Sequence, residues 1–296
     1  MKICPFPTPS PPHIAFIKDK PRNSGLTSLR FVGDKRMVCA DFNEKKMYLV
    51  EMGENGLRLV AAVPTIIGDG TAVQTDLLDV TKEGLVVVSN FYQGTQSFYR
   101  IQGDALNFVS ELKVSNFTGC HGVRFVPGYE DLIWITYCGK GNKYIVIADY
   151  KTGRVHHAME MPEQLQDAAF IGNHVLVPAR TDHISINGPH PGKMYSTVYL
   201  LRLPANLLAS PPVVVDTWHG EGHLDAMVEF GTQAYSANQY TDEVDVFGIG
   251  TDEKVEKRGS IPGFWLPHGL DIRKDGLMGV TNYGDNTLRL FQLGSS

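Results

Sequence analysis

Residues 120–161 read CHGVRFVPGYEDLIWITYCGKGNKYIVIADYKTGRVHHAMEM, and this stretch decides the fold class. It contains four short runs rich in β-branched and aromatic residues: His121–Val126, Leu132–Cys138, Tyr144–Tyr150 and Val155–Met161. Turns that contain Gly, Asp, Asn or Pro separate the runs. Short runs of this composition are typical of β-strands, and the turn residues between them are typical of hairpins. The stretch therefore predicts a unit of four antiparallel strands.

The same unit recurs along the whole chain. Five groups of four runs and a final group of three occupy residues 26–64, 75–115, 120–162, 165–218, 223–262 and 267–293. Repeats of roughly 40–55 residues, each with four strands, are typical of a β-propeller in which every group forms one blade. We therefore expect an all-β chain that forms a single six-bladed propeller domain over residues 1–296. An antiparallel sandwich of many strands is the alternative.

The last group lacks one strand, and the N-terminal part of the chain has a candidate for it. Residues 13–18 read HIAFIK, which is strand-like and belongs to no other group. We expect this segment to fill the outer position of the last blade. Both ends of the chain would then close the ring, and only short, protected sheet edges would remain.

Composition narrows the class of function. A hydrophobic fraction of 43% excludes a disordered chain, and a net charge of −5 argues against a nucleic-acid partner. No apolar run reaches the roughly 18 residues of a membrane helix, so no membrane partner is expected. The start of the chain lacks a signal-peptide pattern, which predicts a cytoplasmic protein, with a mature secreted form as the alternative. Phosphate-binding glycine motifs are missing, so no nucleotide cofactor is expected.

The first strand of each propeller blade lines the central channel, so its first polar residue is of special interest. Aligning the six groups gives one ring of polar residues: Thr27, Asp76, His121, Asp167, Asp225 and His268. The next residue is small in five groups, which lets neighbouring backbones crowd the axis. Strand-end capping is the alternative for any single member, but it does not explain the two histidines in opposite blades.

Second strands run antiparallel to first strands, so they end on the same face. Their last residues form a second expected ring: Asp41, Asn90, Tyr137 (or Cys138), Arg180, Asn238 and Asn282. Trp265 precedes the first strand of the sixth group and could form part of the wall of the channel opening. We expect substrate contacts from Arg180, whose fork suits a carboxylate or phosphate, and from the residues around it, namely Asp41, Asn90, Asn238, Asn282 and Trp265. An ion pair that neutralises the aspartate ring is the alternative for Arg180.

Imidazole and carboxylate groups can bind a divalent cation together or move protons without one. The candidate metal ligands are Asp76, Asp167, Asp225, His121 and His268. The candidate catalytic residues are His121, His268, Asp225 and Tyr137. Oxygen-rich sites suit Ca²⁺ or Mg²⁺, which we place ahead of Zn²⁺ or Mn²⁺.

The repeat pattern resembles the calcium-dependent six-bladed propellers of the gluconolactonase, regucalcin and strictosidine synthase-like group, and the NHL-repeat propellers. Metal ligands of the lactonases begin first strands in P-N-G or P-D-G contexts, and the similar places here read Cys120-His121-Gly122 and Pro267-His268-Gly269. The P-H-G form is similar to the P-H-G-I motif of virginiamycin B lyase, a seven-bladed propeller that uses Mg²⁺ and histidine for elimination. Thr27-Ser28 stands where the lactonases have a first-blade glutamate.

These observations favour an enzyme that acts on a small molecule at the mouth of the channel. We expect lactone hydrolysis or elimination assisted by a divalent cation. A metal-free lyase or cyclase that uses a channel histidine is one alternative, and a non-catalytic binding scaffold is another. The hairpin register also predicts that Cys120 faces Cys138, as two reduced thiols or, alternatively, as a disulfide.

Overall fold

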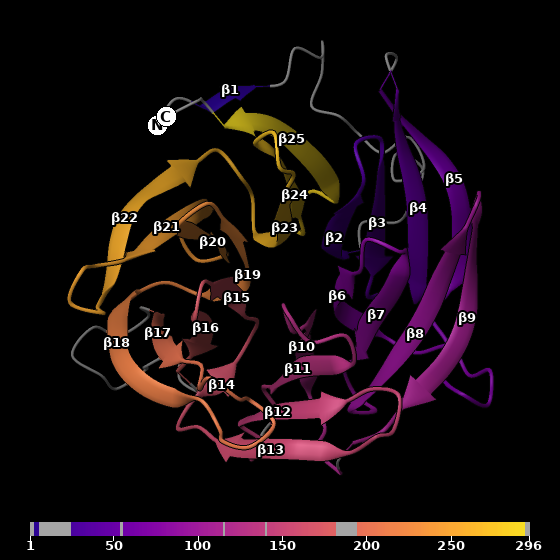
Figure 1. Ribbon diagram of the computed structural model, residues 1–296. Coiled ribbons are helices and arrows are strands. Elements are labelled where there is room, and N and C mark those ends of the chain that lie inside the picture. The colour runs from indigo at the N-terminus through magenta and orange to yellow at the C-terminus, as the bar shows by residue number, and fades with distance from the viewer. Residues whose placement is uncertain are drawn as a thin grey trace.

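The computed structural model describes residues 3–5, 25–53, 56–114, 116–139, 141–181 and 194–293. Within these ranges every regular element is a β-strand, and the strands form six antiparallel sheets. The sheets stand around a central axis like the blades of a propeller (Figure 1). The predicted all-β, six-bladed fold is therefore confirmed. None of the described elements is a helix with the length and apolar character needed to cross a membrane.

Each of the first three blades has four strands in chain order. Blade 1 consists of β2 (Leu26–Val32), β3 (Arg36–Asp41), β4 (Lys46–Gly53) and β5 (Gly56–Pro64). Blade 2 consists of β6 (Thr75–Val80), β7 (Leu85–Asn90), β8 (Thr95–Gln102) and β9 (Ala105–Leu112). Blade 3 consists of β10 (Cys120–Phe125), β11 (Leu132–Tyr137), β12 (Tyr144–Asp149) and β13 (Val155–Glu160).

The last three blades follow the same plan with two variations. Blade 4 consists of β14 (Gln164–Leu165), β15 (Ala169–Ile171), β16 (His174–Arg180), β17 (Tyr195–Arg202) and β18 (Val213–Glu221), with β14 and β15 both paired to β16. Blade 5 consists of β19 (Leu224–Phe230), β20 (Gln233–Asn238), β21 (Glu243–Ile249) and β22 (Val255–Pro262). Blade 6 consists of β23 (Pro267–Ile272), β24 (Leu277–Asn282), β25 (Thr287–Leu293) and β1 (Ile3–Pro5).

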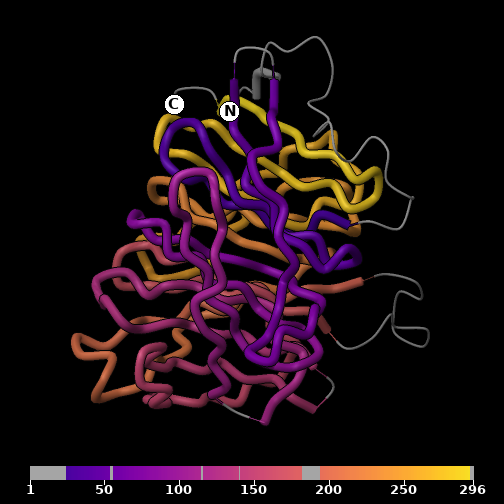
Figure 2. Tube along the Cα trace, turned by 90° about the vertical axis from the view of Figure 1, so that its right-hand side faces the viewer, coloured from indigo at the N-terminus to yellow at the C-terminus, as the bar shows by residue number. Residues whose placement is uncertain are grey.

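A strand from the N-terminal part of the chain closes the last blade, but it is not the expected segment. Strand β1 pairs antiparallel with β25, with Ile3 opposite Leu293. The predicted residues 13–18 lie outside the described residues. The outer position is a sheet edge, where natural strands are often very short. Figure 2 shows the indigo first blade beside the yellow last blade, which completes the ring.

The core lies between neighbouring blades, and burial falls from the axis outward. All residues of β7 are buried, whereas the outermost strand of the same blade, β9, is largely exposed. Trp134 of blade 3, for example, packs edge-on against Phe170 of blade 4, with ring centroids 5.7 Å apart. A fully buried Val, Leu or Phe side chain contributes about 1.5–3 kcal/mol, so the inner strands supply most of the stabilisation.

Every first strand is irregular at its polar ring residue. In five blades the pairing with the second strand shifts register across Thr27, Asp76, His121, Asp225 and His268. In blade 4 the first strand is broken, and Asp167 lies in the gap between β14 and β15. A β-bulge re-aims the side chain of the extra residue. The irregularity therefore turns each ring residue out of the pleat.

The glycines that follow the two ring histidines allow adjacent blades to touch. A Cβ atom on Gly269 would lie 2.4 Å from the carbonyl oxygen of Thr27 and 2.5 Å from the Cα of Ser28. A Cβ on Gly122 would lie 2.5 Å from the carbonyl oxygen of Gln166. The small second residue of the triplet is thus required by the approach of the next blade's backbone.

We predict that Gly269→Ala destabilises the protein by about 1–3 kcal/mol, because backbone atoms of the neighbouring blade cannot yield to the added methyl group. Gly259→Ala is the matched control, since a Cβ there meets nothing within 4 Å. Urea denaturation followed by tryptophan fluorescence would measure both variants. Equal stability of the two variants would show that the blades do not need this close approach.

Candidate functional site

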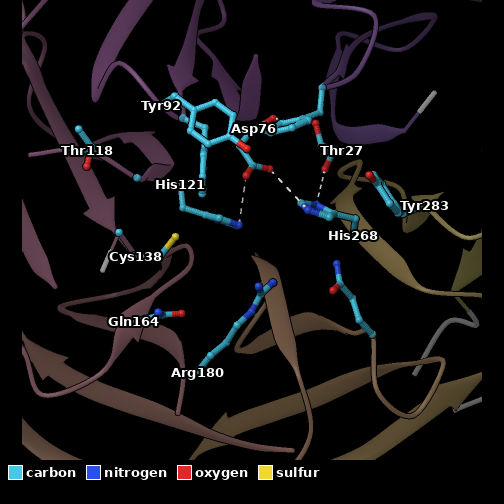
Figure 3. Close-up of a pocket in the computed structure, with 15 residues that line it drawn as sticks. Thr27, Asp76, Tyr92, Thr118, His121, Cys138, Gln164, Arg180, His268 and Tyr283 are labelled. Atoms are coloured by element: carbon cyan, nitrogen blue, oxygen red, sulfur yellow. Dashed lines mark hydrogen bonds and ion pairs between the residues drawn. The ribbon is translucent and has the colours of Figure 1, made fainter. Parts of the chain in front are cut away.

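A cavity of about 600 Å³ lies at the axis on one face of the propeller (Figure 3). Four members of the first ring line it, namely Thr27, Asp76, His121 and His268. Arg180, from the end of β16, also lines it. The structure therefore brings together side chains from five blades that are as many as 241 residues apart in sequence. A volume of this size suits one small organic molecule.

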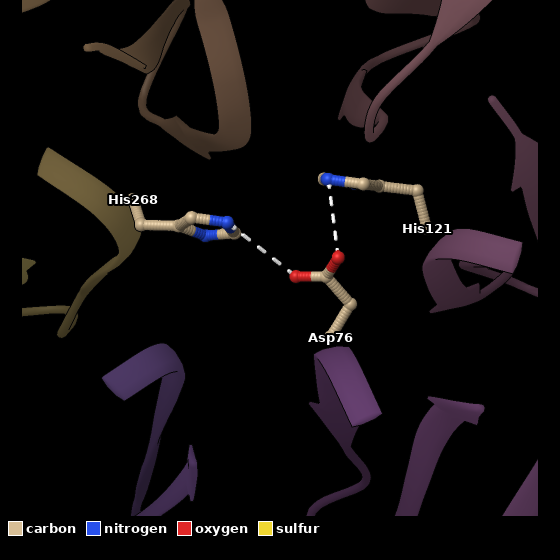
Figure 4. A group of neighbouring side chains, drawn as sticks. All are labelled: Asp76, His121 and His268. Atoms are coloured by element: carbon tan, nitrogen blue, oxygen red, sulfur yellow. Dashed lines mark ion pairs between the residues drawn. The ribbon is translucent and has the colours of Figure 1, made fainter. Parts of the chain in front are cut away.

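Two histidines and two aspartates alternate around the axis. The Nε2 atom of His121 lies 3.3 Å from Asp76 Oδ2 and 3.4 Å from Asp225 Oδ1. The Nε2 atom of His268 lies 3.5 Å from a carboxylate oxygen of each aspartate. The two imidazole rings face each other at a centroid distance of 5.8 Å. We call His121, Asp76, His268 and Asp225 the His-Asp square, and Figure 4 shows the Asp76 half of it.

A hydrogen bond to a backbone carbonyl oxygen fixes the orientation of each histidine ring. The Nδ1 atom of His121 lies 3.0 Å from the carbonyl oxygen of Gln166, and Nδ1 of His268 lies 2.8 Å from that of Thr27. A carbonyl oxygen can only accept, so Nδ1 carries the proton in each ring. Burial lowers the pKa of His121 to about 3 and also lowers the pKa of His268. Both rings are therefore neutral and present an Nε2 lone pair to the aspartates.

The two aspartates of the square differ in charge compensation. Burial, reinforced by the charge of Asp225, raises the pKa of Asp76 well above its usual range. Burial is the largest single influence on Asp225 and raises its pKa, but the Arg180 guanidinium and the neighbouring imidazoles together outweigh it and lower the pKa of that carboxyl to about 2. Asp225 forms an ion pair with Arg180 and accepts a hydrogen bond from Gln239 Nε2 at 2.8 Å. Asp225 is thus held as a carboxylate, whereas the charge on Asp76 is poorly compensated.

Acceptor atoms at the centre of the square lack hydrogen-bond donors. Among the described residues, the buried Oδ1 atoms of Asp76 and Asp225 have no hydrogen-bond partner. One ligand atom from each of Asp76, His121 and His268 lies within 4.8 Å of the others, a spacing compatible with one metal ion. Lone pairs and carboxylates in such proximity repel one another unless a cation lies between them.

Arg180 forms an ion pair with an aspartate of the first ring, which was the alternative to substrate binding. Its Nη2 atom pairs with Asp225, and its Nε donates to the carbonyl oxygen of Leu224 at 3.1 Å. The side chain nevertheless remains 19% exposed and reaches into the cavity from the side opposite Asp76 (Figure 3).

Four of the six residues expected to form the second ring turn away from the cavity. Their side chains cap the turn that follows each strand: Asn90 donates to Thr95 and Ser97, Asn238 to Asp245, and Asn282 to Thr287, while Asp41 accepts from the backbone of Glu44. Short polar side chains at strand ends bond nearby backbone and hydroxyl groups readily. The capping alternative therefore describes their geometry.

The cavity wall is formed instead by the next residue along the chain. These residues are Phe42, Phe91, Cys138, Gln239 and Tyr283, each directly after a second-strand end. Arg180 lines the wall as expected, and so does Cys138, which was the alternative to Tyr137. In the other four blades the wall residue is displaced by one position, because alternate residues of a strand point to opposite sides.

Three further candidates lie away from the cavity wall. Tyr137 is fully buried, and its hydroxyl donates to the carbonyl oxygen of Gly94 at 3.3 Å. The Trp265 side chain is 54% exposed and does not line the cavity. Asp167, although a first-ring member, forms an ion pair of 2.9 Å with Arg124. The geometry places none of the three within the His-Asp square.

Asp167 belongs to a second charged layer that the sequence analysis did not identify. Arg30 and Arg124 are both buried and form ion pairs with Asp79 and Asp167 at 2.9–3.8 Å. Arg30 also donates to the carbonyl oxygen of Leu270, and Arg124 to that of Met227. We call Arg30, Arg124, Asp79 and Asp167 the arginine layer. Its hydrogen bonds and ion pairs connect all six blades.

A sequence signal for this layer does exist. In four first strands a charged residue stands three places after the ring residue: Arg30, Asp79, Arg124 and Asp271. Asp271 accepts from the backbone N–H of Phe31, and Asp79 from that of Phe125, so these carboxylates also join neighbouring blades.

The cysteine register differs from the prediction. Cys120 pairs with Tyr137 instead of Cys138, because the bulge at His121 shifts the ladder by one residue. Cys39, Cys120 and Cys138 are free thiols. Burial raises the pKa of Cys39 and of Cys120 to about 12.

We predict that Arg124→Met lowers the free energy of unfolding by about 3–5 kcal/mol, because it leaves the buried Asp167 carboxylate without its closest cation. The control is Arg58→Met, which removes a largely exposed ion pair with Glu51 and should change the free energy of unfolding far less, because solvent screens that pair. Chemical denaturation of both variants tests this. Similar losses would mean that the arginine layer contributes no more than a surface ion pair.

No protein-family model and no curated protein matches the sequence of this chain. Solved structures match its fold. The chain is similar to a structure of Kuenenia stuttgartiensis hydrazine synthase, with 13% identity, a TM-score of 0.62, and coverage of 92% of this chain and 96% of that chain. It is also similar to the RRP9 WD40 repeats (8% identity, TM-score 0.62, 99% and 100% coverage) and to the WD40 β-propeller domain of Doa1 (12%, 0.58, 93% and 95%). At such identities the likeness establishes the propeller fold alone.

Proposed function

We propose that the His-Asp square binds one divalent cation, and that the protein is an enzyme that uses it to open a lactone or to eliminate a leaving group from a small molecule. The observation that carries this proposal is the convergence of two Nε2 lone pairs and two carboxylates, with an unpartnered oxygen on each aspartate. A buried acceptor without a donor costs about 1–3 kcal/mol. A bound cation could take one ligand atom each from Asp76, His121 and His268, which lie within 4.8 Å of one another, beside the Asp225 carboxylate.

The donor set suggests which ion fits. Two imidazole nitrogens come from His121 and His268, and the oxygens come from Asp76 and Asp225. Imidazole favours transition metals, whereas Ca²⁺ and Mg²⁺ prefer sites made of oxygen alone. We therefore place Zn²⁺ and Mn²⁺ ahead of the Ca²⁺ or Mg²⁺ that the sequence favoured.

The cation would polarise a substrate carbonyl or lower the pKa of a bound water. The chain's own groups supply the rest of the chemistry. Gln166 and Thr27 fix the two histidines through their carbonyl oxygens, so that both Nε2 atoms stay directed at the centre. Arg180 orients a polar group of the substrate, and Phe91 limits access of water from one side. The Oδ1 atom of Asp76, without a donor among the described groups, can accept a proton.

One observation favours a metal-free lyase or cyclase as the second candidate. The raised pKa of Asp76, caused by its burial, would let a proton take the place of the cation. A protonated Asp76 could donate to Nε2 of His268 or His121, and that histidine could then exchange the proton with a substrate.

We predict that the dialysed wild-type protein binds about one equivalent of Mn²⁺ or Zn²⁺, because Asp76, His121 and His268 offer a single set of ligand atoms. Asp76→Asn should weaken this binding by more than about 100-fold, since it removes a charged ligand. His156→Gln, on the outer strand β13, should bind as the wild type does. Isothermal titration calorimetry and elemental analysis measure both quantities.

The same variants separate the candidate functions in a screen of lactones and elimination substrates. A cation-assisted enzyme loses turnover when a chelator is added and regains it with the ion. Turnover that ignores the chelator but fails in His121→Ala would support the metal-free lyase or cyclase. Binding of no ion by the wild type would contradict the cation proposal.

We further predict opposite stability effects for the two aspartates in the ion-free protein. Asp76→Asn should raise the melting temperature by about 2–4 °C, because it removes a buried and poorly compensated charge worth about 1 kcal/mol. Asp225→Asn should lower it, because Arg180 loses its buried partner. Added Mn²⁺ should then stabilise only the wild type of these three proteins. Destabilisation by both substitutions would show that the charge on Asp76 is already compensated.

A further inference from the structure

We propose that the substrate is a small monocarboxylate with a flat, apolar body, whose acid group lies against Arg180. The inference rests on the proposed cation site and names the substrate class of that same cavity. Three features carry it: the charge balance of the cavity, the fixed guanidinium of Arg180, and the aromatic side chains opposite it.

The charge balance of the loaded site favours an anion. Asp76 and Asp225 bring two negative charges, and Arg180 brings one positive charge. The two histidines add no charge, because each donates its Nδ1 proton to a backbone carbonyl oxygen and would give its Nε2 lone pair to the cation. A divalent cation would leave one positive charge in excess among the buried side chains of the square. A ligand with a single negative charge neutralises it, whereas a phosphate dianion would overcompensate.

Arg180 is prepared to receive a carboxylate. Its Nε and Nη2 atoms are held by Leu224 and Asp225, which fixes the plane of the guanidinium group. The group has five donors in total, and it reaches into the cavity in Figure 3. A fixed planar fork binds a carboxylate with good geometry, and little side-chain freedom is lost on binding.

Aromatic side chains form the opposite part of the wall. Phe42 packs against Phe91 and Tyr92, with ring centroids 5.9 and 6.0 Å apart, and Phe91 packs edge-on against Tyr92 at 5.1 Å. Tyr283 lies beside His268, with centroids 6.0 Å apart. In Figure 3, Tyr92 and Tyr283 lie across the cavity from Arg180. Rigid aromatic surfaces of this kind favour a flat apolar group over a flexible polar one.

The test compares two probes of equal shape, phenylacetate and phenylacetamide, on the protein loaded with Mn²⁺. Titration with Mn²⁺ alone comes first and tests the cation site by itself. We expect phenylacetate to bind at least about 10-fold more tightly than the amide, because hydrogen bonds to charged groups exceed those to neutral ones. Acetate, which lacks the ring, should bind more weakly than phenylacetate.

Substitutions assign the preference to its residue. Arg180→Gln should remove the preference for phenylacetate over the amide, and Arg180→Lys should retain part of it, since the charge remains without the fork. If Arg180→Gln fails to fold, Arg180→Lys still reports the effect. Tyr283→Leu should weaken both ring-bearing probes by a similar factor and leave acetate unchanged.

The possible failures are distinguishable. If the protein binds no Mn²⁺, the proposed cation site fails, and the charge balance argued above fails with it. If Mn²⁺ binds but the two ring-bearing probes bind equally, the cation site stands and the carboxylate inference is overturned. An unchanged preference in Arg180→Gln would likewise overturn the assignment of the acid group to Arg180.

Discussion

The structure depends on how charge is compensated at the propeller axis. Six first strands crowd there, and each brings a polar residue into a region without bulk water. In the arginine layer, Arg30 and Arg124 solve this problem through ion pairs with Asp79 and Asp167 and through hydrogen bonds to backbone carbonyl groups. Because these contacts link all six blades, the same interactions neutralise the buried charges and hold the ring together. Removing either side of such a pair would leave a buried charge exposed to the full desolvation penalty.

The His-Asp square is built from the same strands but follows the opposite principle. Its histidines are neutral, its aspartates lie close together, and an oxygen of each aspartate has no donor among the described residues. One layer is therefore compensated within the protein, while the other retains acceptor oxygens without donors, which the proposed cation would satisfy. Proteins commonly tolerate such local instability where a ligand will be bound. The compensated layer holds the strands that position the incomplete one.

Most of the fold could be predicted from the sequence, because the spacing of strands and turns repeats in every blade. The first ring could also be aligned, since polar residues at equivalent strand starts stand out. Side-chain direction could not be predicted. Asp167 shares its position with Asp76, yet a broken strand directs it to Arg124. Asn90 caps the following turn and points away from the cavity, so that Phe91 forms the wall instead. These outcomes depend on bulges and on partners distant in sequence, which strand patterns alone do not encode.

The arginine layer also lies across the propeller axis, along which a small molecule would move. Its ion pairs and hydrogen bonds join the first strands around the axis, three residues further along these strands than Thr27, Asp76 and His121. A molecule that moves from the cavity along the axis therefore meets a layer of paired charges. Under the proposed enzymatic function, a product that stays in the cavity would exclude the next substrate, and its release, as much as chemistry, could set the rate of turnover.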